Sequence, residues 1–183
     1  QANKENRFAG RTEEELHPEG IAQIHHVGEK LINDNISGIY CGPATRTVQS
    51  SQILASLLDV PFTRLDELHE INIPHWDGLT KEEIRQKYEG QYPTWLNSPN
   101  TFKLPGCETL EQVQNRAVAC LTSLLARHKQ GKLLVVSHLI VLRCLVLYFQ
   151  RMAIKDFRSV KIVNGEIIRV SEMGNDRYLI NSL

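Results

Sequence analysis

The sequence has no long hydrophobic run and no excess of charge of either sign. None of its stretches approaches the roughly 18 consecutive apolar residues of a membrane-spanning helix. Lysine and arginine together number 21, as do aspartate and glutamate, so the formal net charge of the 183 residues is zero. This balance argues against nucleic acid or a membrane as a partner, although it is compatible with a local basic pocket.

Cysteine is scarce, and its four positions are far apart: Cys41, Cys107, Cys120 and Cys144. Because no two of them have CxxC spacing, the sequence argues against a zinc ribbon or a thioredoxin-type redox pair. Scattered cysteines are typical of reduced thiols in a cytoplasmic protein, with a disulfide as the alternative. The first residues are polar, without methionine or an apolar signal segment. We therefore expect a cytoplasmic chain that begins inside a longer protein or after processing.

The length and the composition, 42% hydrophobic and 23% charged, suit a single globular domain that covers residues 1–183. One zone differs, because residues 70–108 contain four prolines and both tryptophans among polar residues. We expect this zone to be a surface excursion with a short helix at 80–88. Excursions of this length often cover a functional site.

The rest of the sequence alternates between helical and strand-like patterns. Apolar residues at helical spacing predict helices at 18–33, 44–58, 110–128 and 140–149. Short apolar runs predict strands at 36–41, 61–68 and 133–136, the last typical of a parallel strand buried on both faces. Asn164-Gly165 predicts a hairpin between 159–163 and 166–170, and 178–180 suits a last strand. This order indicates an α/β fold with a mostly parallel sheet and an antiparallel edge.

Three side chains suited to catalysis or anion binding follow the predicted strands: Arg46, Glu70 and His138. Ligands of parallel sheets bind beyond the carboxyl ends of the strands. Arg46 stands at the entry to a helix, where its planar fork and the helix N-terminus both suit an oxyanion. Glu70 can act as a general acid if a pocket raises its pKa. Taken singly, each residue also suits an ordinary structural role, so the residues alone predict an anion-binding α/β domain and no more.

Segments along the whole chain resemble motifs of the histidine phosphatase superfamily, in its phosphoglycerate-mutase-like branch. Residues 41–50, CGPATRTVQS, resemble S-S-P-x-x-R-A-x-Q-T, and residues 70–79, EINIPHWDGL, resemble E-I-x-x-G-x-W-E-G-L. Residues 105–109, PGCET, are similar to P-G-G-E-S, and residues 135–138, VVSH, to the motif that carries the family's second catalytic histidine. Residues 3–10 look like the segment after the catalytic loop, and residues 16–20 like the start of the next helix. The preserved order makes the resemblance specific.

The resemblance implies a three-layer α/β/α sandwich and a phosphatase that works through a phosphohistidine, with no metal or other cofactor. Arg46 would bind the phosphoryl oxygens, His138 would hydrogen-bond the same group, and Glu70 would protonate the leaving alcohol. The expected ligand is a small phosphorylated substrate or inorganic phosphate, and the protein could form a homodimer. The positions that the resemblance assigns to substrate binding are Asn3, Arg7, Ala9, Gly10 and Leu139.

The family's first strand and its R-H-G loop, which carries the nucleophilic histidine, match no part of the sequence. By motif order they would directly precede Gln1, and no other histidine takes their place. One interpretation is a complete enzyme with the nucleophile upstream, and the alternative is an inactive pseudophosphatase that serves as a binding or regulatory module. We expect the chain alone to have negligible phosphatase activity and to fold poorly without that strand, because its loss exposes strand edges.

Two features favour hydrolysis over a phosphoglycerate-mutase-type phosphotransfer. The chain is too short for the long insertion of the mutases, and Ile71 stands where mutases carry an arginine for the substrate carboxylate. Leu139 and Pro74 each stand where the family usually has glycine, which predicts a tighter phosphate pocket at Leu139. A dinucleotide-binding Rossmann domain is poorly supported, because no GxGxxG follows a predicted strand.

Overall fold

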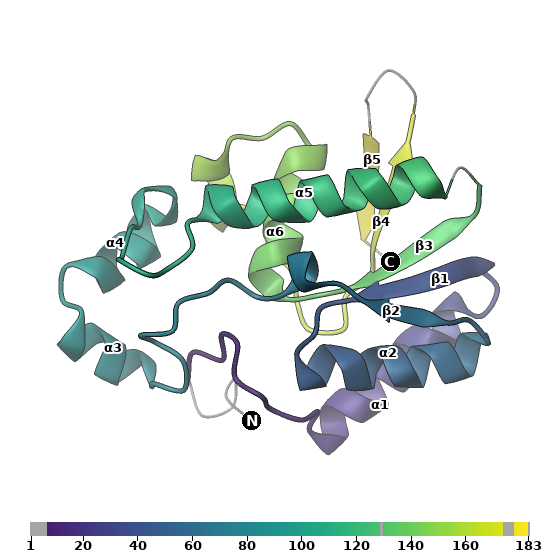
Figure 1. The fold of residues 1–183 in the computed structure, drawn as a ribbon, viewed down its shortest axis with the longest axis horizontal. Coiled ribbons are helices and arrows are strands. Elements are labelled where there is room, and N and C mark those ends of the chain that lie inside the picture. Colours follow the sequence, from purple (N-terminus) through teal and green to yellow (C-terminus); the bar gives the residue numbers. More distant parts are fainter. Residues whose placement is uncertain (1–6, 129, 174–177, 183) are drawn as a thin grey trace.

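The computed structural model describes residues 7–128, 130–173 and 178–182. Figure 1 shows a parallel sheet with helices on both of its faces. Helices α1 (Pro18–Leu31) and α2 (Thr45–Leu58) lie on one side, and α5 (Leu110–Arg127) and α6 (Leu139–Phe149) lie on the other. This three-layer arrangement confirms the predicted fold class.

The sheet has the order β2-β1-β3, and both pairings are parallel. Strand β1 (Ile36–Cys41) lies in the middle, between β2 (Phe62–Arg64) and β3 (Lys132–Val136). Apolar and β-branched residues favour these strands, since they pack well on a pleated surface covered by helices. A short 3-10 helix, η1 (Asp66–Leu68), follows β2 and takes the place of the second half of the predicted strand at 61–68.

Two hydrophobic cores hold the layers together. The smaller core joins α1 and α2 to the sheet through Val27, Leu31, Ile39 and Leu54. The larger core lies on the side of α5 and α6, where residues such as Val113 and Val141 are fully buried. Thr109 begins α5 with a capping box, because its hydroxyl accepts from the backbone N–H of Gln112 and the Gln112 side chain accepts from Thr109 N–H. The layers are thus fixed from both faces of the sheet.

Residues 70–108 contribute much of the larger core. They form α3 (Lys81–Lys87), α4 (Gln91–Asn97) and the 3-10 helix η2 (Pro99–Thr101). Trp76 is fully buried, and Trp95 and Phe102 pack around it with ring centroids 5.9 and 5.0 Å away. Both tryptophans therefore serve to pack this zone against α5 and α6. The proline-rich pattern hid α4, since Pro93 lies within it.

The predicted hairpin across Asn164-Gly165 is wrong. These two residues do form a turn, with Gly165 at a φ of +75°. Residues 159–163, however, follow the 3-10 helix η3 (Ile154–Arg158) and form no strand, because Val160 is buried against the larger core instead. The antiparallel hairpin pairs β4 (Ile168–Glu172) with β5 (Tyr178–Ser182), in a separate two-stranded sheet.

Strand β3 is less enclosed than its apolar sequence predicts. Residues Leu133 to Val136 are half-buried, whereas the sequence predicts full burial on both faces. Within the part of the chain that the structure describes, β3 pairs with β1 and with no second strand. A strand that is apolar along most of its length and has one unpaired edge is a template for a further strand.

The structure bears on the cysteines and on membrane-spanning helices. All four cysteines are free thiols. No helix among the described residues is both long and apolar enough to cross a membrane.

Candidate functional site

The carboxyl ends of β1 and β3 and the segment after η1 meet at one edge of the sheet. Gly42 N–H, after β1, donates to the carbonyl of Val136 at 3.1 Å. Ser137, after β3, donates its hydroxyl to the carbonyl of Leu68 at 2.7 Å. These contacts fix the backbone immediately next to Arg46, His138 and Glu70. A Cβ at Gly42 would lie 2.6 Å from the Leu68 carbonyl oxygen, so this close approach requires glycine.

Arg46 lies in the first turn of α2 and reaches across to the N-terminal segment. Its two terminal nitrogens donate to the carbonyls of Thr12 and Gly10, at 2.9 and 2.7 Å. Nη2 also lies 3.2 Å from Nδ1 of His138. Burial lowers the pKa of Arg46, while the nearby carboxyl of Glu70 opposes the shift. The guanidinium thus remains a cation with a fixed orientation at the sheet edge.

His138 directly precedes the first residue of α6, and it is only 6% exposed. Because the Arg46 guanidinium can only donate, Nδ1 of His138 must accept, and the ring proton lies on Nε2. Burial and then the charge of Arg46 hold the pKa of His138 well below its usual value, so the ring is neutral. Nε2 is buried and finds no hydrogen-bond partner among the described residues. Such an orphaned donor costs about 1–3 kcal/mol, which a bound oxyanion would offset.

Glu70 is the third member of the group and is only 8% exposed. Burial raises the pKa of its carboxyl to about 7, although the backbone hydrogen bond from Ile71 and the charge of Arg46 both act to lower it. Oε1 accepts that bond from Ile71 N–H at 2.8 Å. A carboxyl that keeps its proton near neutral pH can donate it to a leaving group. The three side chains together offer two donors for an anion and one transferable proton.

The family of the chain follows from comparison with known proteins. A sequence model described as the histidine phosphatase superfamily (branch 1) matches residues 1–182.

The chain belongs to the histidine phosphatase superfamily.

Curated relatives in this superfamily are named as phosphatases and phosphoglycerate mutases. Phosphoserine phosphatase 1 of Hydrogenobacter thermophilus is 27% identical over 143 residues, which are 78% of this chain and 68% of the relative. The probable phosphoglycerate mutase GpmB of Salmonella choleraesuis is 26% identical over 170 residues, which are 93% of this chain and 79% of the relative. The solved structure of YhfR from Bacillus stearothermophilus has the same fold, with a TM-score of 0.93 at 23% identity, and the match covers 98% of this chain and 89% of that one.

The structure describes four of the five remaining positions that the superfamily resemblance assigns to the substrate, and their contacts differ. Arg7 donates to the Gly78 carbonyl at 2.8 Å, and its Nη1 lies 3.9 Å from Glu83 Oε2. Ala9 and Gly10 form the turn whose carbonyls meet Thr12 and Arg46. Leu139 is 40% exposed at the first position of α6. Asn3 lies outside the described residues.

Sequence reasoning missed a set of charged residues that holds the backbone of Glu70. Arg11 Nε and Arg116 Nη2 both donate to the Glu70 carbonyl, at 2.9 and 3.2 Å. The carboxylate of Glu108 binds both arginines, at 3.0 Å to Arg11 and 2.8 Å to Arg116. It also accepts from Asn72 N–H at 2.8 Å. The PGCET motif contains Glu108, but nothing in the sequence connects it to Arg116, eight residues later, or to Arg11, 97 residues earlier.

We expect Glu108→Gln to lower the free energy of unfolding by about 1–2 kcal/mol, because it weakens charged hydrogen bonds to two half-buried arginines. Burial raises the pKa of Glu108, but its hydrogen bonds and the charges of the two arginines outweigh burial and hold the pKa below the usual value. The matched control is Glu82→Gln, which removes an exposed carboxylate 3.6 Å from Arg85 and should cost less than about 0.5 kcal/mol. Urea denaturation of both variants measures the difference, and equal losses would contradict the assigned role of Glu108.

The pH dependence of stability should report the buried carboxyl of Glu70. Its folded pKa of about 7 lies above the ordinary 4.5, so the folded chain keeps a proton that the unfolded chain has lost. The contribution of this bound proton to the free energy of unfolding is fully present below pH 4.5. It is lost as the pH rises to about 7, at up to about 1.4 kcal/mol per pH unit. Subtracting the pH profile of Glu70→Gln from that of the unsubstituted chain isolates this slope. A flat difference would show that Glu70 titrates normally.

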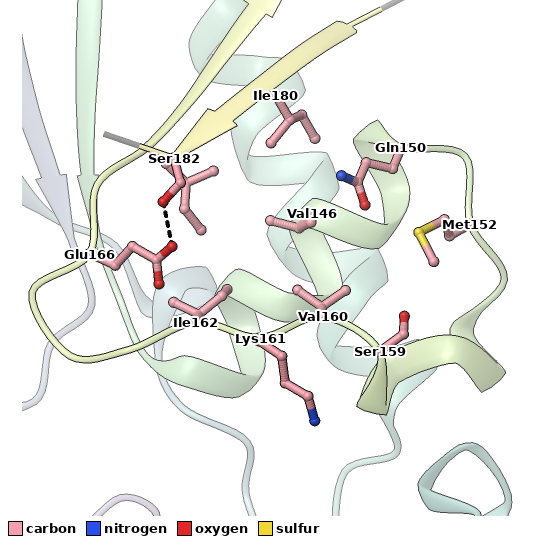
Figure 2. A pocket seen from close by; sticks show the side chains of 11 residues that line it. Val146, Gln150, Met152, Ser159, Val160, Lys161, Ile162, Glu166, Ile180 and Ser182 are labelled. Atoms are coloured by element: carbon pink, nitrogen blue, oxygen red, sulfur yellow. Dashed lines mark hydrogen bonds between the residues drawn. The ribbon is translucent and has the colours of Figure 1, made fainter.

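A separate cavity of about 350 Å³ lies between α6 and the β4–β5 hairpin. Figure 2 shows Val146 of α6, Val160 and Ile180 of β5 among the residues that line it, with Glu166 and Ser182 hydrogen-bonded at one side. Neither Arg46, Glu70 nor His138 lines this cavity. The group of Arg46, Glu70 and His138 at the sheet edge is therefore distinct from this cavity.

Proposed function

We propose that the chain is the main part of a phosphomonoester hydrolase that acts on a small phosphorylated metabolite through a phosphohistidine. The observation that carries the proposal is the juxtaposition of the Arg46 guanidinium, the orphaned Nε2 of His138 and the buried carboxyl of Glu70, whose pKa is raised to about 7. Membership of the histidine phosphatase superfamily supports the same chemistry.

In the proposed reaction, a histidine nitrogen attacks phosphorus and the bond to the leaving oxygen breaks. Arg46 and His138 Nε2–H bind the phosphoryl oxygens and stabilise the charge that develops on them. Glu70 gives its proton to the leaving alcohol and becomes a carboxylate. Water then attacks the phosphohistidine, Glu70 takes the proton of the water, and phosphate is released with the nucleophile restored.

We also propose that the nucleophilic histidine comes from a segment outside residues 1–183 that pairs with the free edge of β3. Two features support this proposal. Strand β3, apolar from Leu133 to Val136, has an unpaired edge among the described residues, and the buried His138 Nε2 at the carboxyl end of that strand is without a partner there. A strand added at this edge would end beside His138. In the alternative, a pseudophosphatase, the anion site would bind phosphate without turning it over.

Hydrolysis is favoured over transfer to a second substrate by the surroundings of Ile71. This side chain is fully buried in the larger core, so the position next to Glu70 offers no charge for a substrate carboxylate. The free thiols of all four cysteines support a location in the reducing cytoplasm. A homodimer stays a prediction.

The test is to incubate the intact natural protein with small phosphomonoesters, including phosphoserine and 3-phosphoglycerate, and to measure released phosphate. We expect turnover and, after acid-free quenching, a phosphoryl adduct on histidine in the intact mass. Glu70→Gln should lower kcat by about 10²–10⁴-fold for alkyl phosphates. It should lower kcat much less for p-nitrophenyl phosphate, whose leaving group needs no proton. Phosphate binding without turnover would establish the pseudophosphatase instead.

A further inference from the structure

His69, which the proposed reaction does not use, lies directly against the catalytic group. It follows η1, precedes Glu70 and is half-buried. Its ring stacks on that of His138, with centroids 5.9 Å apart and an angle of 27° between the planes. It is therefore a second imidazole at the edge of the anion site, more open to solvent than His138.

The hydrogen bonding of His69 fixes which ring nitrogen carries the proton. Glu70 N–H donates to Nδ1 of His69 at 2.9 Å. A backbone amide can only donate, so Nδ1 must present its lone pair and the proton lies on Nε2. Burial, and then the charges of Arg11, Arg46 and Arg116, lower the pKa of His69 despite the opposing charge of Glu13, so the neutral ring persists.

The proton on Nε2 has no acceptor within the described part of the chain. His69 makes the Nδ1 contact and the ring stack, and no hydrogen bond from Nε2 to another described residue is present. Unlike Nε2 of His138, this nitrogen is not fully enclosed. It is a preoriented donor with some access to solvent, and the positive charges that act on it outnumber the negative charge of Glu13.

We propose that Nε2–H of His69 donates a hydrogen bond to the phosphoryl group held by Arg46 and His138, and so is a further substrate-binding residue. This inference rests on the proposed function, because it requires a phosphoryl group at that site. The site then has two imidazole donors: the buried Nε2–H of His138 and the more exposed Nε2–H of His69.

Two substitutions separate this role from a merely structural one. Asparagine places an amide oxygen where Nδ1 lies, so His69→Asn keeps the acceptor for Glu70 N–H but loses the outer donor. Glutamine places an amide nitrogen where Nε2 lies, so His69→Gln keeps the outer donor. If His69 only positions Glu70, asparagine should substitute well and glutamine poorly. If His69 binds the phosphoryl group, the order is reversed.

The experiment is calorimetric titration of inorganic phosphate into the intact natural protein and its variants. We expect His69→Asn to weaken binding about tenfold, the loss of one hydrogen bond to a charged group, and His69→Gln to stay within about threefold. Equal affinities, or a greater loss in His69→Gln, overturn the inference. Long-range proton–nitrogen NMR should show the His69 proton on Nε2, and a proton on Nδ1 overturns it as well.

Arg46→Ala separates failure of this inference from failure of the proposed function. If Arg46→Ala loses phosphate and His69→Asn does not, the anion site stands and only the role of His69 falls. If the unsubstituted protein binds no phosphate, both fall together.

Discussion

Replacing Arg46 with alanine is expected to weaken the binding of inorganic phosphate by about a hundredfold or more. A hydrogen bond from a guanidinium to an oxyanion is stronger than a neutral one, and the positive charge of Arg46 adds to the attraction. Arg46 also ties the N-terminal segment to α2 through the carbonyls of Gly10 and Thr12, and it sets the tautomer of His138. Its loss removes one ligand of the phosphate and loosens a second, His138. Calorimetric titration with phosphate measures the effect.

Arg46→Lys is the matched control for this prediction. Lysine keeps the charge but not the planar fork, so it cannot serve both backbone carbonyls and an oxyanion with the same geometry. We expect an affinity between those of Arg46→Ala and the unsubstituted protein. Circular dichroism should confirm that both variants are folded. A folded Arg46→Ala variant with undiminished affinity would place the anion elsewhere.

Replacing Trp76 with alanine is expected to lower the free energy of unfolding by about 3–5 kcal/mol. The indole is fully buried and lies at the centre of an aromatic cluster. Five rings surround it at centroid distances of 5.0–6.1 Å, those of Phe8, Tyr88, Tyr92, Trp95 and Phe102. Alanine would leave a cavity between α3, α4 and the N-terminal segment, which cannot all collapse together. Equilibrium denaturation in urea measures the loss.

Two further substitutions calibrate the effect of Trp76. Trp76→Phe keeps much of the volume, and it removes an indole N–H that has no partner among the described residues, so it should cost far less. Leu96→Ala, on α4 but 44% exposed, should change stability by about 0.5 kcal/mol or less. A mild Trp76→Ala variant would mean that residues 70–108 are not an integral part of the larger core.

The sequence predicts those parts of the structure that depend on local pattern and motif order. The apolar pattern places α1, α2, α5 and α6 to within a few residues, because α1 and α5 bury one face each and α6 is buried along most of its length. The rule that parallel strands end at one edge correctly brings Arg46 and His138 together. The roles assigned to them, and to Glu70, stay predictions.

Features that depend on distant partners could not be predicted. Asn164-Gly165 forms a turn in any case, but whether a hairpin follows depends on what residues 159–163 pack against. Arg11 and Arg116 both donate hydrogen bonds to the Glu70 carbonyl. Arg11 also pairs with Glu108, 97 residues away, and charged residues at such spacing carry no local signal. The raised pKa of Glu70 likewise arises from burial by the whole fold.

The parallel pairing of β1 with β3 has a consequence for how the molecule folds. The contact between Ser37 and Lys132 spans 95 residues, so the chain must close a long loop before this pairing forms. Contacts between α1 and α2 are far more local and can form first. During synthesis the anion pocket cannot exist until His138 and α6 have left the ribosome. A phosphate bound there as proposed would therefore stabilise only the completed sheet edge and could not assist the early steps of folding.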